Sequence, residues 1–403
     1  MSNPIQGKRI VLGITGSIAC YKVADLASKL SQAGAAVDVI LTEGARQFLT
    51  PLTFQSVTGR RAYTDDDLWG SEAHVLHVGL AHDADLLAIV PATANSLAKL
   101  AHGQSDNLLS VTALAATCPL LLAPAMDGGM YSHPATQANL TVLEERGAKI
   151  VGPEEGHLAS GLVAMGRMSE PAAILGAIRY HLSRSGPLQG IQVVITAGGT
   201  REALDPVRFL TNHSSGKQGY ALAQAALDAG AEVTLITTSS LPTPVGANVV
   251  SINSTQEMAE AVLYATTKAD VLLMAAAVAD YRPAQIAEQK IKKSDDDLRI
   301  DLVRNPDILI QVANQRRQAD RPRVVIGFAA ETQNLRENAA GKLQRKNLDM
   351  IVANDVSAAD AGFGVDTNRV FLLERDESEV ELPLMTKSEV AQIVIDKVVQ
   401  FIQ

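Results

Sequence analysis

The hydrophobic residues of this chain recur in short strand-like runs, each followed by a segment with helical spacing. Residues 9–14 form an aliphatic run that leads into a glycine turn, and a helical pattern follows to about residue 30. The same order returns at 191–195, which precedes the loop 196–217 and a helical pattern over 218–229. Alternating strands and helices are typical of α/β domains with parallel sheets, and the pattern therefore predicts this class.

Two patterns in the first half return in the second half. Residues 33–42 read AGAAVDVILT and residues 229–238 read AGAEVTLITT, while ADLLAIVPATAN (84–95) is echoed by ADVLLMAAAVADY (269–281). We interpret the repeats as two doubly wound, Rossmann-like domains. Turn residues cluster in SRSGPLQG, so the expected boundaries are a first domain over 1–182, a linker over 183–190 and a second domain over 191–403.

Length, charge and cysteine usage narrow the class of protein. A chain of 403 residues exceeds what one core normally supports, and its formal charge of −9 with no basic face argues against a nucleic-acid partner. The beginning of the chain has no apolar signal region, and the most apolar window, 108–126, contains polar residues and a proline. We interpret that window as a buried helix followed by a buried strand. Cys20 and Cys118 form no CxxC pair, so we expect neither a disulfide framework nor a zinc site, and a cytoplasmic location.

Small and polar residues follow several predicted strands of the first half. In doubly wound sheets ligands bind outside the carboxyl ends of the strands. The segments 13–17, 91–95, 105–107 and 124–127 occupy such positions and outline a nucleotide-sized pocket. His77 precedes the strand near residue 86, but His74 and His82 compete with it, and a purely structural role is the alternative for each histidine.

The loop 196–217, TAGGTREALDPVRFLTNHSSGK, carries more polar chemistry than a simple connection needs. Gly198 and Gly199 permit a tight turn and close approach of a ligand, and a helix N-cap with free N–H groups is expected at Ser214, Ser215 and Gly216. The cationic and hydrogen-bonding side chains between them indicate an anion site: Arg201, Arg208, Asn212, His213 and Lys217. An ordinary long connection with solvated charges is the alternative. Because neither glycine loop reads GxGxxG, an ordinary NAD dehydrogenase is not predicted.

Longer motifs resemble two known families. PATAN, PAMDGGMYSHPAT (124–136) and the histidine segment resemble the flavin-binding cysteine decarboxylases. The loop 196–217 is similar to that of phosphopantothenate–cysteine ligases, as are AAAVADYRP (275–283), KIKK (290–293), NPDIL (305–309), GFAAET (327–332) and KNLDMIVAND (346–355). Their order resembles the bacterial bifunctional family of coenzyme A biosynthesis over nearly all of the chain.

For the first half, the resemblance implies an FMN site, with His77 at the position of the catalytic histidine. The cofactor residues it implies are Gly13, Thr15, Gly16, Ser17, Thr42, Pro91, Thr93, Asn95 and Ser105. Two catalytic positions depart from the family. Asp127 stands where an asparagine would donate a hydrogen bond to the carboxylate that is lost, and an ionised aspartate would repel it. Ser160 stands where a cysteine donates a proton, and a hydroxyl is a much weaker acid.

For the second half, the resemblance implies ligation through an acyl-cytidylate, with CTP as co-substrate and Mg²⁺, whose ligands the sequence does not identify. Lys290 would balance charge on the triphosphate, and Asn212 would hold the acyl-cytidylate while the amine of cysteine attacks it. The implied nucleotide-binding residues are Gly198, Gly199, Ser214, Ser215, Gly216, Asp280, Lys290, Asp307, Ile308, Leu309, Ile310, Phe328, Lys342 and Lys346.

Some of these residues also have a purely structural role as an alternative. Asp280, read as the end of a strand, is also suited to capping the next segment, and Phe328 to core packing. The lysines near Lys290, and the pair Lys342 and Lys346 one helical turn apart, also fit a solvated surface.

Three functions follow from these residues. The first is an enzyme that ligates cysteine to 4′-phosphopantothenate and then decarboxylates the product to 4′-phosphopantetheine. The second keeps only the ligase, and the third is a flavoprotein that binds and regulates a partner. Whether ATP replaces CTP is left open. The resemblance also implies a homo-oligomer, with trimeric flavin domains and dimeric ligase domains that together allow a dodecamer.

Overall fold

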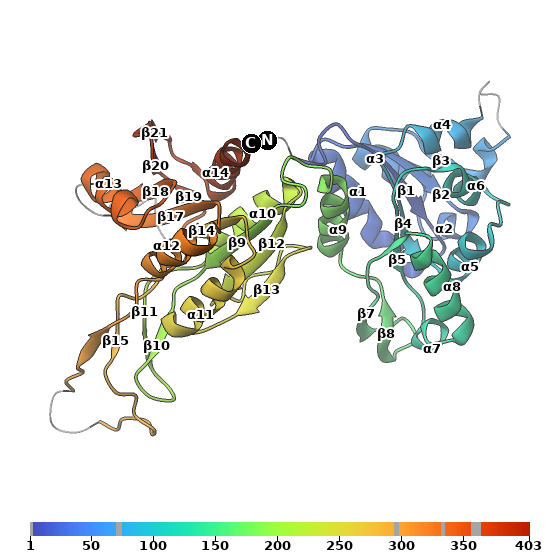
Figure 1. Cartoon of the computed structure of the whole chain (residues 1–403). Helices are drawn as coiled ribbons and strands as arrows, with labels where there is room; N and C mark the ends of the chain where they lie inside the picture. The colour runs from blue at the N-terminus through green and yellow to red at the C-terminus, as the bar shows by residue number, and fades with distance from the viewer. Residues whose placement is uncertain (1–2, 70–74, 294–297, 332–334, 356–363) are drawn as a thin grey trace. The chain divides into compact units, whose positions relative to one another are not determined.

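A computed structural model describes residues 3–69, 75–293, 298–331, 335–355 and 364–403, and His74 lies outside these residues. The chain folds into two compact units that divide between Ser183 and Arg184 (Figure 1). Leu188 in the segment expected to be a linker is fully buried, and its N–H donates to the carbonyl oxygen of Ala229 at 2.8 Å. This segment therefore packs on the second unit.

The first unit contains a parallel six-stranded sheet in the order β3-β2-β1-β4-β5-β6. Its neighbouring strands all pair in parallel. The bounds are β1 Arg9–Ile14, β2 Ala36–Leu41, β3 Ala62–Thr64, β4 Leu86–Ala92, β5 Leu120–Pro124 and β6 Lys149–Ile150. The predicted strand over 9–14 and the parallel sheet are confirmed.

Helices cover both faces of this sheet. One buried cluster joins side chains of the sheet to α1 (Val23–Gln32), α3 (Pro51–Thr58) and α9 (Pro171–Ser183). A second cluster, on the other face, joins the sheet to α4 (Leu76–His82), α5 (Ala94–His102), α6 (Leu108–Ala115) and α8 (Pro134–Glu145). The apolar window 108–126 is the helix and strand that its pattern predicted. The shorter elements are η1 Ile18–Lys22, α2 Glu43–Arg46, η2 Asp65–Asp67, α7 Gly128–Tyr131 and the hairpin of β7 Glu154–His157 with β8 Val163–Arg167.

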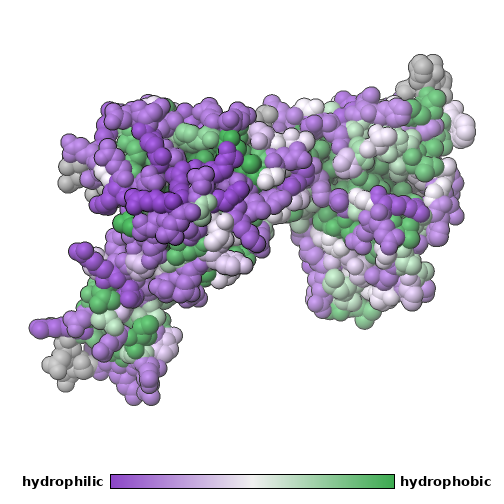
Figure 2. All heavy atoms as spheres, viewed as in Figure 1, coloured by the Kyte–Doolittle hydropathy of each residue, from purple (hydrophilic) through white to green (hydrophobic). Residues whose placement is uncertain are grey.

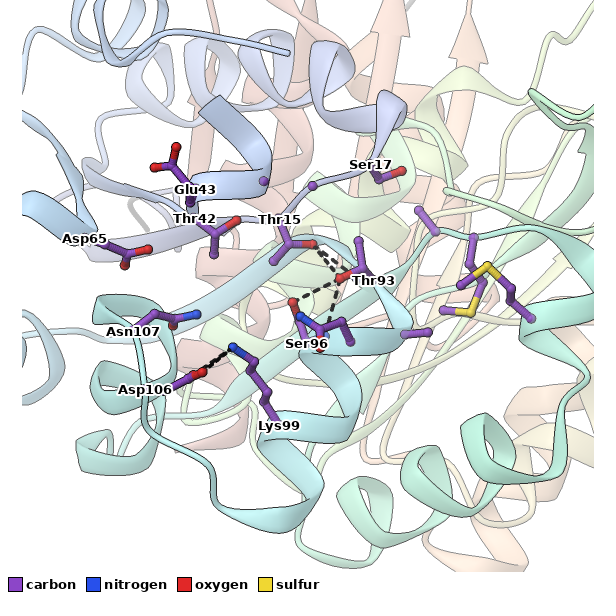
Figure 3. A pocket seen from close by; sticks show the side chains of 17 residues that line it. Thr15, Ser17, Thr42, Glu43, Asp65, Thr93, Ser96, Lys99, Asp106 and Asn107 are labelled. Atoms are coloured by element: carbon purple, nitrogen blue, oxygen red, sulfur yellow. Dashed lines mark hydrogen bonds and ion pairs between the residues drawn. The ribbon is translucent and has the colours of Figure 1, made fainter. Parts of the chain in front are cut away.

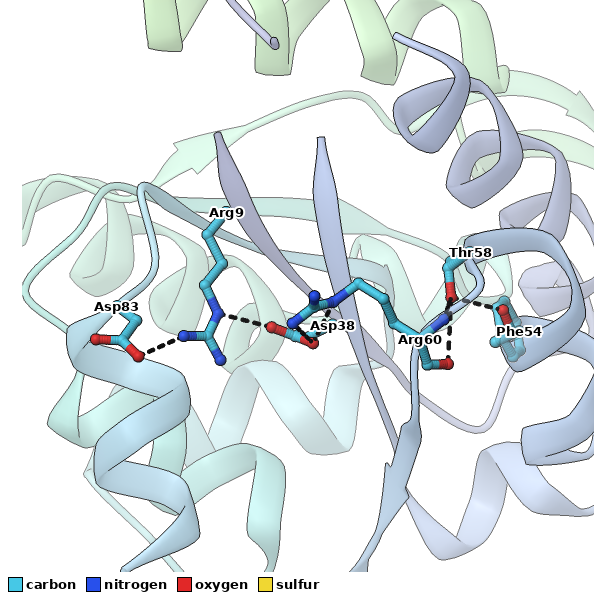
Figure 4. Close-up of polar contacts among 6 residues, drawn as sticks. All are labelled: Arg9, Asp38, Phe54, Thr58, Arg60 and Asp83. Carbon is cyan, nitrogen blue, oxygen red and sulfur yellow. Dashed lines mark hydrogen bonds and ion pairs between the residues drawn. The ribbon is translucent and has the colours of Figure 1, made fainter. Parts of the chain in front are cut away.

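A network of charged side chains ties together the amino-terminal region of β1, β2 and β3 (Figure 4). The Asp38 side chain on β2 is only 1% exposed. It accepts hydrogen bonds from Arg9 Nε at 2.7 Å and Arg60 Nε at 2.9 Å, and Arg9 also pairs with Asp83. A buried carboxylate is retained here because two guanidinium groups replace its lost hydration.

The second unit has an eight-stranded sheet in the order β13-β12-β9-β14-β17-β18-β20-β21. The bounds are β9 Gln192–Ala197, β12 Glu232–Thr237, β13 Asn248–Ser251, β14 Val271–Met274, β17 Val324–Glu331, β18 Met350–Asp355, β20 Val370–Glu374 and β21 Glu379–Glu381. The first six strands in this order pair in parallel, and β20 and β21 extend the sheet antiparallel. The doubly wound class is confirmed. The antiparallel extension by β20 and β21 was not predicted. These two strands are joined by a short turn, which only permits antiparallel pairing.

Helices of the second unit also pack on both faces. A buried cluster joins the sheet to α11 (Thr255–Thr266), α12 (Ile308–Ala319) and α13 (Leu335–Arg345). The helices α10 (Lys217–Asp228) and α14 (Lys387–Ile402) pack against each other, and both also contact the sheet. In the described residues no helix combines the length and apolar character needed to cross a bilayer.

Three small strand pairs lie outside the large sheet. They are β10 Arg201–Ala203 with β11 Phe209–Thr211, β15 Tyr281–Pro283 with β16 Leu302–Arg304, and β19 Thr367–Asn368 with β22 Met385–Thr386. The β15–β16 pair begins an arm that projects from the sheet of its unit (Figure 1). Apolar side chains are exposed along this arm (Figure 2), among them Ile286, Leu298 and Leu302.

Candidate functional sites

A cavity of about 670 Å³ lies at the carboxyl edge of the first sheet (Figure 3). This volume is in the range of small-molecule and cofactor sites. Its walls come from the segments after β1, β2, β3, β4 and β5, as expected for a parallel sheet. The cofactor residues expected from the sequence that line it are Thr15, Gly16, Ser17, Thr42, Thr93 and Asn95.

Threonine hydroxyls brace the strand ends around this cavity. Thr15 Oγ1 donates to the Pro91 carbonyl oxygen at 2.7 Å and accepts from the Thr93 N–H at 3.1 Å, so it joins the ends of β1 and β4. Thr42 Oγ1 donates to the Ile14 carbonyl oxygen at 3.1 Å and thereby joins the ends of β2 and β1. These hydroxyls hold the cavity wall in shape, and its backbone groups and remaining side chains are left to contact a ligand.

Thr93 also begins α5, the helix whose first residues line the cavity. Its hydroxyl accepts from the Ser96 N–H at 3.4 Å and lies 3.1 Å from the Ser96 hydroxyl, as an N-cap side chain does. The dashed lines in Figure 3 show how Thr15, Thr93 and Ser96 form one hydrogen-bonded group.

Three charged lining residues were missed in the sequence, namely Glu43, Asp65 and Lys99, whereas Asp106 belongs to the expected segment 105–107. Lys99 Nζ bonds to both Asp106 carboxylate oxygens, at 2.7 and 2.8 Å, and lowers the pKa of that carboxyl. Lys99 follows Asn95 by one helical turn, so helical spacing would have placed it on the same face. Asp65 follows β3 directly, and the strand-end rule would have found it had that short strand been predicted.

Four expected residues lie outside the lining formed by the described residues: Gly13, Pro91, Ser105 and His77. Gly13 is inside β1, where a Cβ would collide with Leu109, so its small size allows α6 to pack closely on the strand. Pro91 contributes through its carbonyl group, and Ser105 is exposed just before Asp106. His77 is half-buried on α4.

A second cavity, of about 510 Å³, shares Ser17, Ala125 and Met126 with the first. The β7–β8 hairpin forms part of its wall, and the Met126 N–H donates to the Gly166 carbonyl oxygen at 3.0 Å. Both departures from the flavin family lie here, since Asp127 and Ser160 line the cavity.

Asp127 and Ser160 are hydrogen-bonded to each other. Ser160 Oγ donates to Asp127 Oδ2 at 2.6 Å, and the Gly129 N–H donates to Asp127 Oδ1 at 3.0 Å, which caps α7. The hydroxyl and then the N–H stabilise the charged form, so they lower the pKa of the Asp127 carboxyl. The side chain is therefore ionised at neutral pH.

In the second unit, two glycines of the loop 196–217 lie against other segments of the same chain. Gly198 has φ +86°, and a Cβ there would collide with Thr238, while a Cβ on Gly199 would lie 2.8 Å from the Asn212 carbonyl oxygen. The space beside Gly198 is therefore bounded by the Thr238 and Ser239 side chains, and the space beside Gly199 by the backbone of Asn212.

The start of α10 lies within the expected group of Ser214, Ser215 and Gly216. Its N-cap is Gly216, with φ +80° and no side-chain cap bond. A β-carbon at Gly216 would collide with Ser239, and Ser239 Oγ donates to the Ser215 carbonyl oxygen at 3.0 Å. Ser215 Oγ accepts a long hydrogen bond, of 3.5 Å, from the Lys217 N–H, the first N–H of the helix.

A smaller cavity, of about 120 Å³, lies at this helix start. It is lined by Ser214, Ser215, Gly216, Phe328 and residues after β14, of which the first four were expected nucleotide-binding residues. Asn212 Nδ2 donates to the carbonyl oxygens of Ala277, in the lining, and Val278, at 3.3 and 3.1 Å. Buried Asn368, whose Oδ1 has no hydrogen-bond partner, and Lys387 also line it and were missed, because the fold alone brings α14 and β19 to this place.

The other expected residues lie outside the lining of this cavity as the described residues define it. Asp307 caps α12 and forms an ion pair with Lys346 at 2.9 Å, so two separately expected residues do meet. Ile308 and Leu309 are buried in the core, whereas Ile310 is 37% exposed. Lys342 is half-buried on α13.

Asp280 and Lys290 belong to the arm. β14 ends at Met274, so Asp280 does not close that strand, and its carbonyl oxygen accepts from the Asn305 N–H at 2.8 Å beside β15 and β16. Its exposed side chain caps no helix. Lys290 is exposed in the stretch between those two strands. Within the described ranges no group of three or more His, Cys, Asp or Glu side chains is arranged to hold a metal ion.

Comparison with known proteins assigns each unit to a family. Residues 1–183 match the family described as flavoprotein, and residues 188–402 match the DNA/pantothenate metabolism flavoprotein C-terminal domain. The chain is 44% identical to the coenzyme A biosynthesis bifunctional protein CoaBC of Bacillus subtilis (strain 168), over 98% of this chain and 97% of that protein. The chain belongs to this bifunctional family.

A further relative agrees with this assignment. The CoaBC protein of Vibrio cholerae serotype O1 is 47% identical over 97% of this chain and 98% of its own. A crystal structure of the C-terminal domain of a CoaBC protein is 41% identical and covers 54% of this chain and 98% of that domain, with a TM-score of 0.46. The chain is thus a bifunctional enzyme of coenzyme A biosynthesis, with a flavoprotein decarboxylase unit followed by a ligase unit.

Proposed function

We propose that the ligase unit joins cysteine to 4′-phosphopantothenate with CTP, and that the flavin unit then decarboxylates 4′-phosphopantothenoylcysteine to 4′-phosphopantetheine. The observation that carries this proposal is that each unit has a cavity at the carboxyl edge of its own doubly wound sheet, of about 670 Å³ in the flavin unit and about 120 Å³ in the ligase unit. The family to which the chain belongs supports the order of the two units.

In the flavin unit, the 670 Å³ cavity fits FMN by size and by its polar rim. The N–H groups of the turn after β1 and the side chains of Ser17, Asn95 and Ser96 would hold it, with Met126 against its apolar part. When bound, FMN supplies a two-electron acceptor and donor. The adjoining 510 Å³ cavity would hold the cysteinyl end of the substrate between the β7–β8 hairpin and Asp127.

In the ligase unit, the substrate carboxylate would attack the α-phosphorus of CTP. The new C–O–P bond forms as the bond to pyrophosphate breaks, and pyrophosphate leaves with the electron pair. The amine of cysteine would then attack the acyl carbon, release CMP and lose a proton to form the amide. Lys290 would balance triphosphate charge, Asn212 would orient the acyl-cytidylate, and the N–H groups of the first turn of α10 suit an anionic group.

Magnesium would act through the nucleotide. Mg²⁺ usually keeps several waters and binds one or two carboxylates together with substrate phosphates. Asp307 is engaged by Lys346, and the described residues hold no preformed acidic cluster, so most of the ligands would come from CTP and water.

The flavin assignment is tested by denaturing the purified protein and measuring the flavin released. We expect about one FMN per chain and a yellow protein. A chain that releases no flavin and binds none when FMN is added would contradict the assignment of the first cavity.

The ligase assignment is tested by Asn212→Asp and Lys290→Gln. Both side chains are exposed, so we expect stability changes below about 1 kcal/mol. Lys290→Gln should block CTP-dependent pyrophosphate release, whereas Asn212→Asp should release pyrophosphate without forming the cysteine product. Normal ligation by either variant would contradict its role.

One observation favours a second candidate, a ligase whose flavin unit decarboxylates poorly. The hydrogen bond from Ser160 stabilises the charged form of Asp127, and that charge would repel a substrate carboxylate. We further propose a cytoplasmic enzyme whose copies associate, with flavin units as trimers and ligase units as dimers. Sedimentation that shows a monomer at micromolar concentration would contradict this assembly.

A further inference from the structure

A buried carboxylate in the loop between β9 and α10 is saturated with hydrogen bonds. The Asp205 side chain has no exposed surface. Its Oδ1 accepts from the N–H groups of Val207 and Arg208, both at 2.8 Å. Its Oδ2 accepts from Arg208 Nε at 2.9 Å and Nη2 at 2.6 Å, and from the Ile291 N–H at 3.1 Å. The last of these bonds crosses to the arm that carries Lys290.

Asp205 and Arg208 hold both backbone polar groups of Ile291. The Ile291 N–H donates to Asp205, and its carbonyl oxygen accepts from Arg208 Nη2 at 2.6 Å. Ala287, four residues earlier, donates its N–H to the Leu204 carbonyl oxygen at 3.0 Å. Residues 284–293 form neither helix nor strand, so their position depends on such long-range bonds.

The charges of Asp205 and Arg208 balance each other, so neither competes for the ammonium group of Lys290. The Asp205 carboxylate is paired with the Arg208 guanidinium, and the two together present no free anion to the neighbouring Lys290. Lys290 is exposed, so its ammonium group is directed by the backbone on which it stands rather than by burial.

We propose that Asp205 and Arg208 are positioning residues for Lys290. They fix the backbone at Ile291 and so place the adjacent ammonium group against the triphosphate while the acyl-cytidylate forms. The inference rests on the proposed function, which takes Lys290 as the cation of that step. Misplacing a catalytic group by about 1 Å costs on the order of 100-fold in rate.

Asp205→Asn tests the proposal, because its amide nitrogen cannot accept the hydrogen bonds that the carboxylate accepts. The matched control is Glu202→Gln on β10. Glu202 is also buried and accepts from the Thr255 N–H at 3.0 Å and Oγ1 at 2.7 Å, on another side of the same loop. Two readouts are compared: the rate of CTP-dependent pyrophosphate release and the hydrogen-exchange rate of the Ile291 amide.

We expect Asp205→Asn to lower the pyrophosphate rate by about 10- to 100-fold and to speed exchange at Ile291. Glu202→Gln should change neither. Equal losses in both variants would mean that Asp205 only stabilises the loop, and would overturn the proposal, as would a normal rate in Asp205→Asn. If Asp205→Asn does not fold, Arg208→Gln is judged by the same criteria, because the Arg208 side chain is 43% exposed.

A double variant separates this inference from the proposed function. In a Lys290→Gln background, measured at high enzyme concentration, Asp205→Asn should have no further effect, because a positioning residue has nothing left to position. A further, independent loss would overturn the positioning role while leaving Lys290 in place. A normal rate in Lys290→Gln alone would contradict the role of Lys290 in the proposed function.

Discussion

At the scale of single residues, the pairing of Asp127 with Ser160 changes how the flavin unit is understood. From the sequence the two residues were separate departures, one affecting substrate binding and one affecting proton donation. The structure joins them through a 2.6 Å hydrogen bond across 33 residues of sequence. Their effects on decarboxylation should therefore be coupled.

The first prediction concerns the charge of Asp127. Ser160→Ala removes a donor to the charged carboxylate, so the pKa of Asp127 should rise towards its ordinary value. Ser132→Ala is the control, since Ser132 Oγ donates to the Gly128 carbonyl oxygen and does not contact Asp127. NMR titration of the Asp127 side chain measures both. An unchanged pKa in Ser160→Ala would show that the hydroxyl does not stabilise the charge.

The second prediction concerns decarboxylation. Because the pKa of Asp127 is lowered, its carboxylate stays charged between pH 6 and pH 8, and lowering the pH within this range should not rescue the reaction. Asp127→Asn should lower KM for 4′-phosphopantothenoylcysteine by about tenfold or more, since it replaces a like charge by a donor. Ser160→Cys alone should chiefly change the final reduction to the thiol product.

A variant that carries both Asp127→Asn and Ser160→Cys tests whether the two residues act together. If the pair acts as a unit, the effects of Asp127→Asn and Ser160→Cys will not add. Decarboxylation by the unmodified protein at the rate of the double variant throughout pH 6 to 8 would contradict the account of these two residues.

At the scale of elements, sequence patterns predicted the sheets better than the contacts made between elements. The apolar runs at 9–14 and 191–195 and the repeated segments predicted the parallel strands around both glycine loops. The strand-end rule found Thr15 and Thr93 in the cavity wall, and the family resemblance added Thr42. The pair of Asp307 with Lys346 and the bond from Ile291 to Asp205 were not predicted, because each joins segments that only the folded chain brings together.

The sequence also did not predict which atoms lie beside its glycines. The glycines at the strand ends were interpreted as room for a ligand. At Gly13 and Gly198 the space is filled by Leu109 and Thr238. Sequence alone does not tell whether a glycine makes room for a ligand or for the chain itself.

The third prediction concerns the charged network that joins β1, β2 and β3. Asp38→Asn leaves the guanidinium groups of Arg9 and Arg60 facing a neutral amide, and should lower the free energy of unfolding of the first unit by about 3 kcal/mol. Asp25→Asn is the control, because Asp25 is exposed and pairs only with Lys29 one helical turn away among its described salt bridges. Hydrogen exchange of the β1 and β2 amides measures the loss. A difference below about 0.5 kcal/mol between the two variants would contradict a structural role for Asp38.

At the scale of the whole molecule, the chain carries two chemistries on two copies of one architecture. Both sheets share the strand order in which the first strand lies beside the second and the fourth of its sheet, and both have a cavity at their carboxyl edges. The departures at Asp127 and Ser160 affect the flavin unit only. The ligase unit should therefore work at full rate even where decarboxylation is slow.

The most direct test of the central claim is a timed reaction of the purified protein with 4′-phosphopantothenate, cysteine, CTP and Mg²⁺, with the products resolved by mass. We expect 4′-phosphopantothenoylcysteine to form first and only with CTP, followed more slowly by 4′-phosphopantetheine with loss of CO₂. If no CTP-dependent cysteine adduct forms, the account of this chain as a ligase joined to a decarboxylase is wrong.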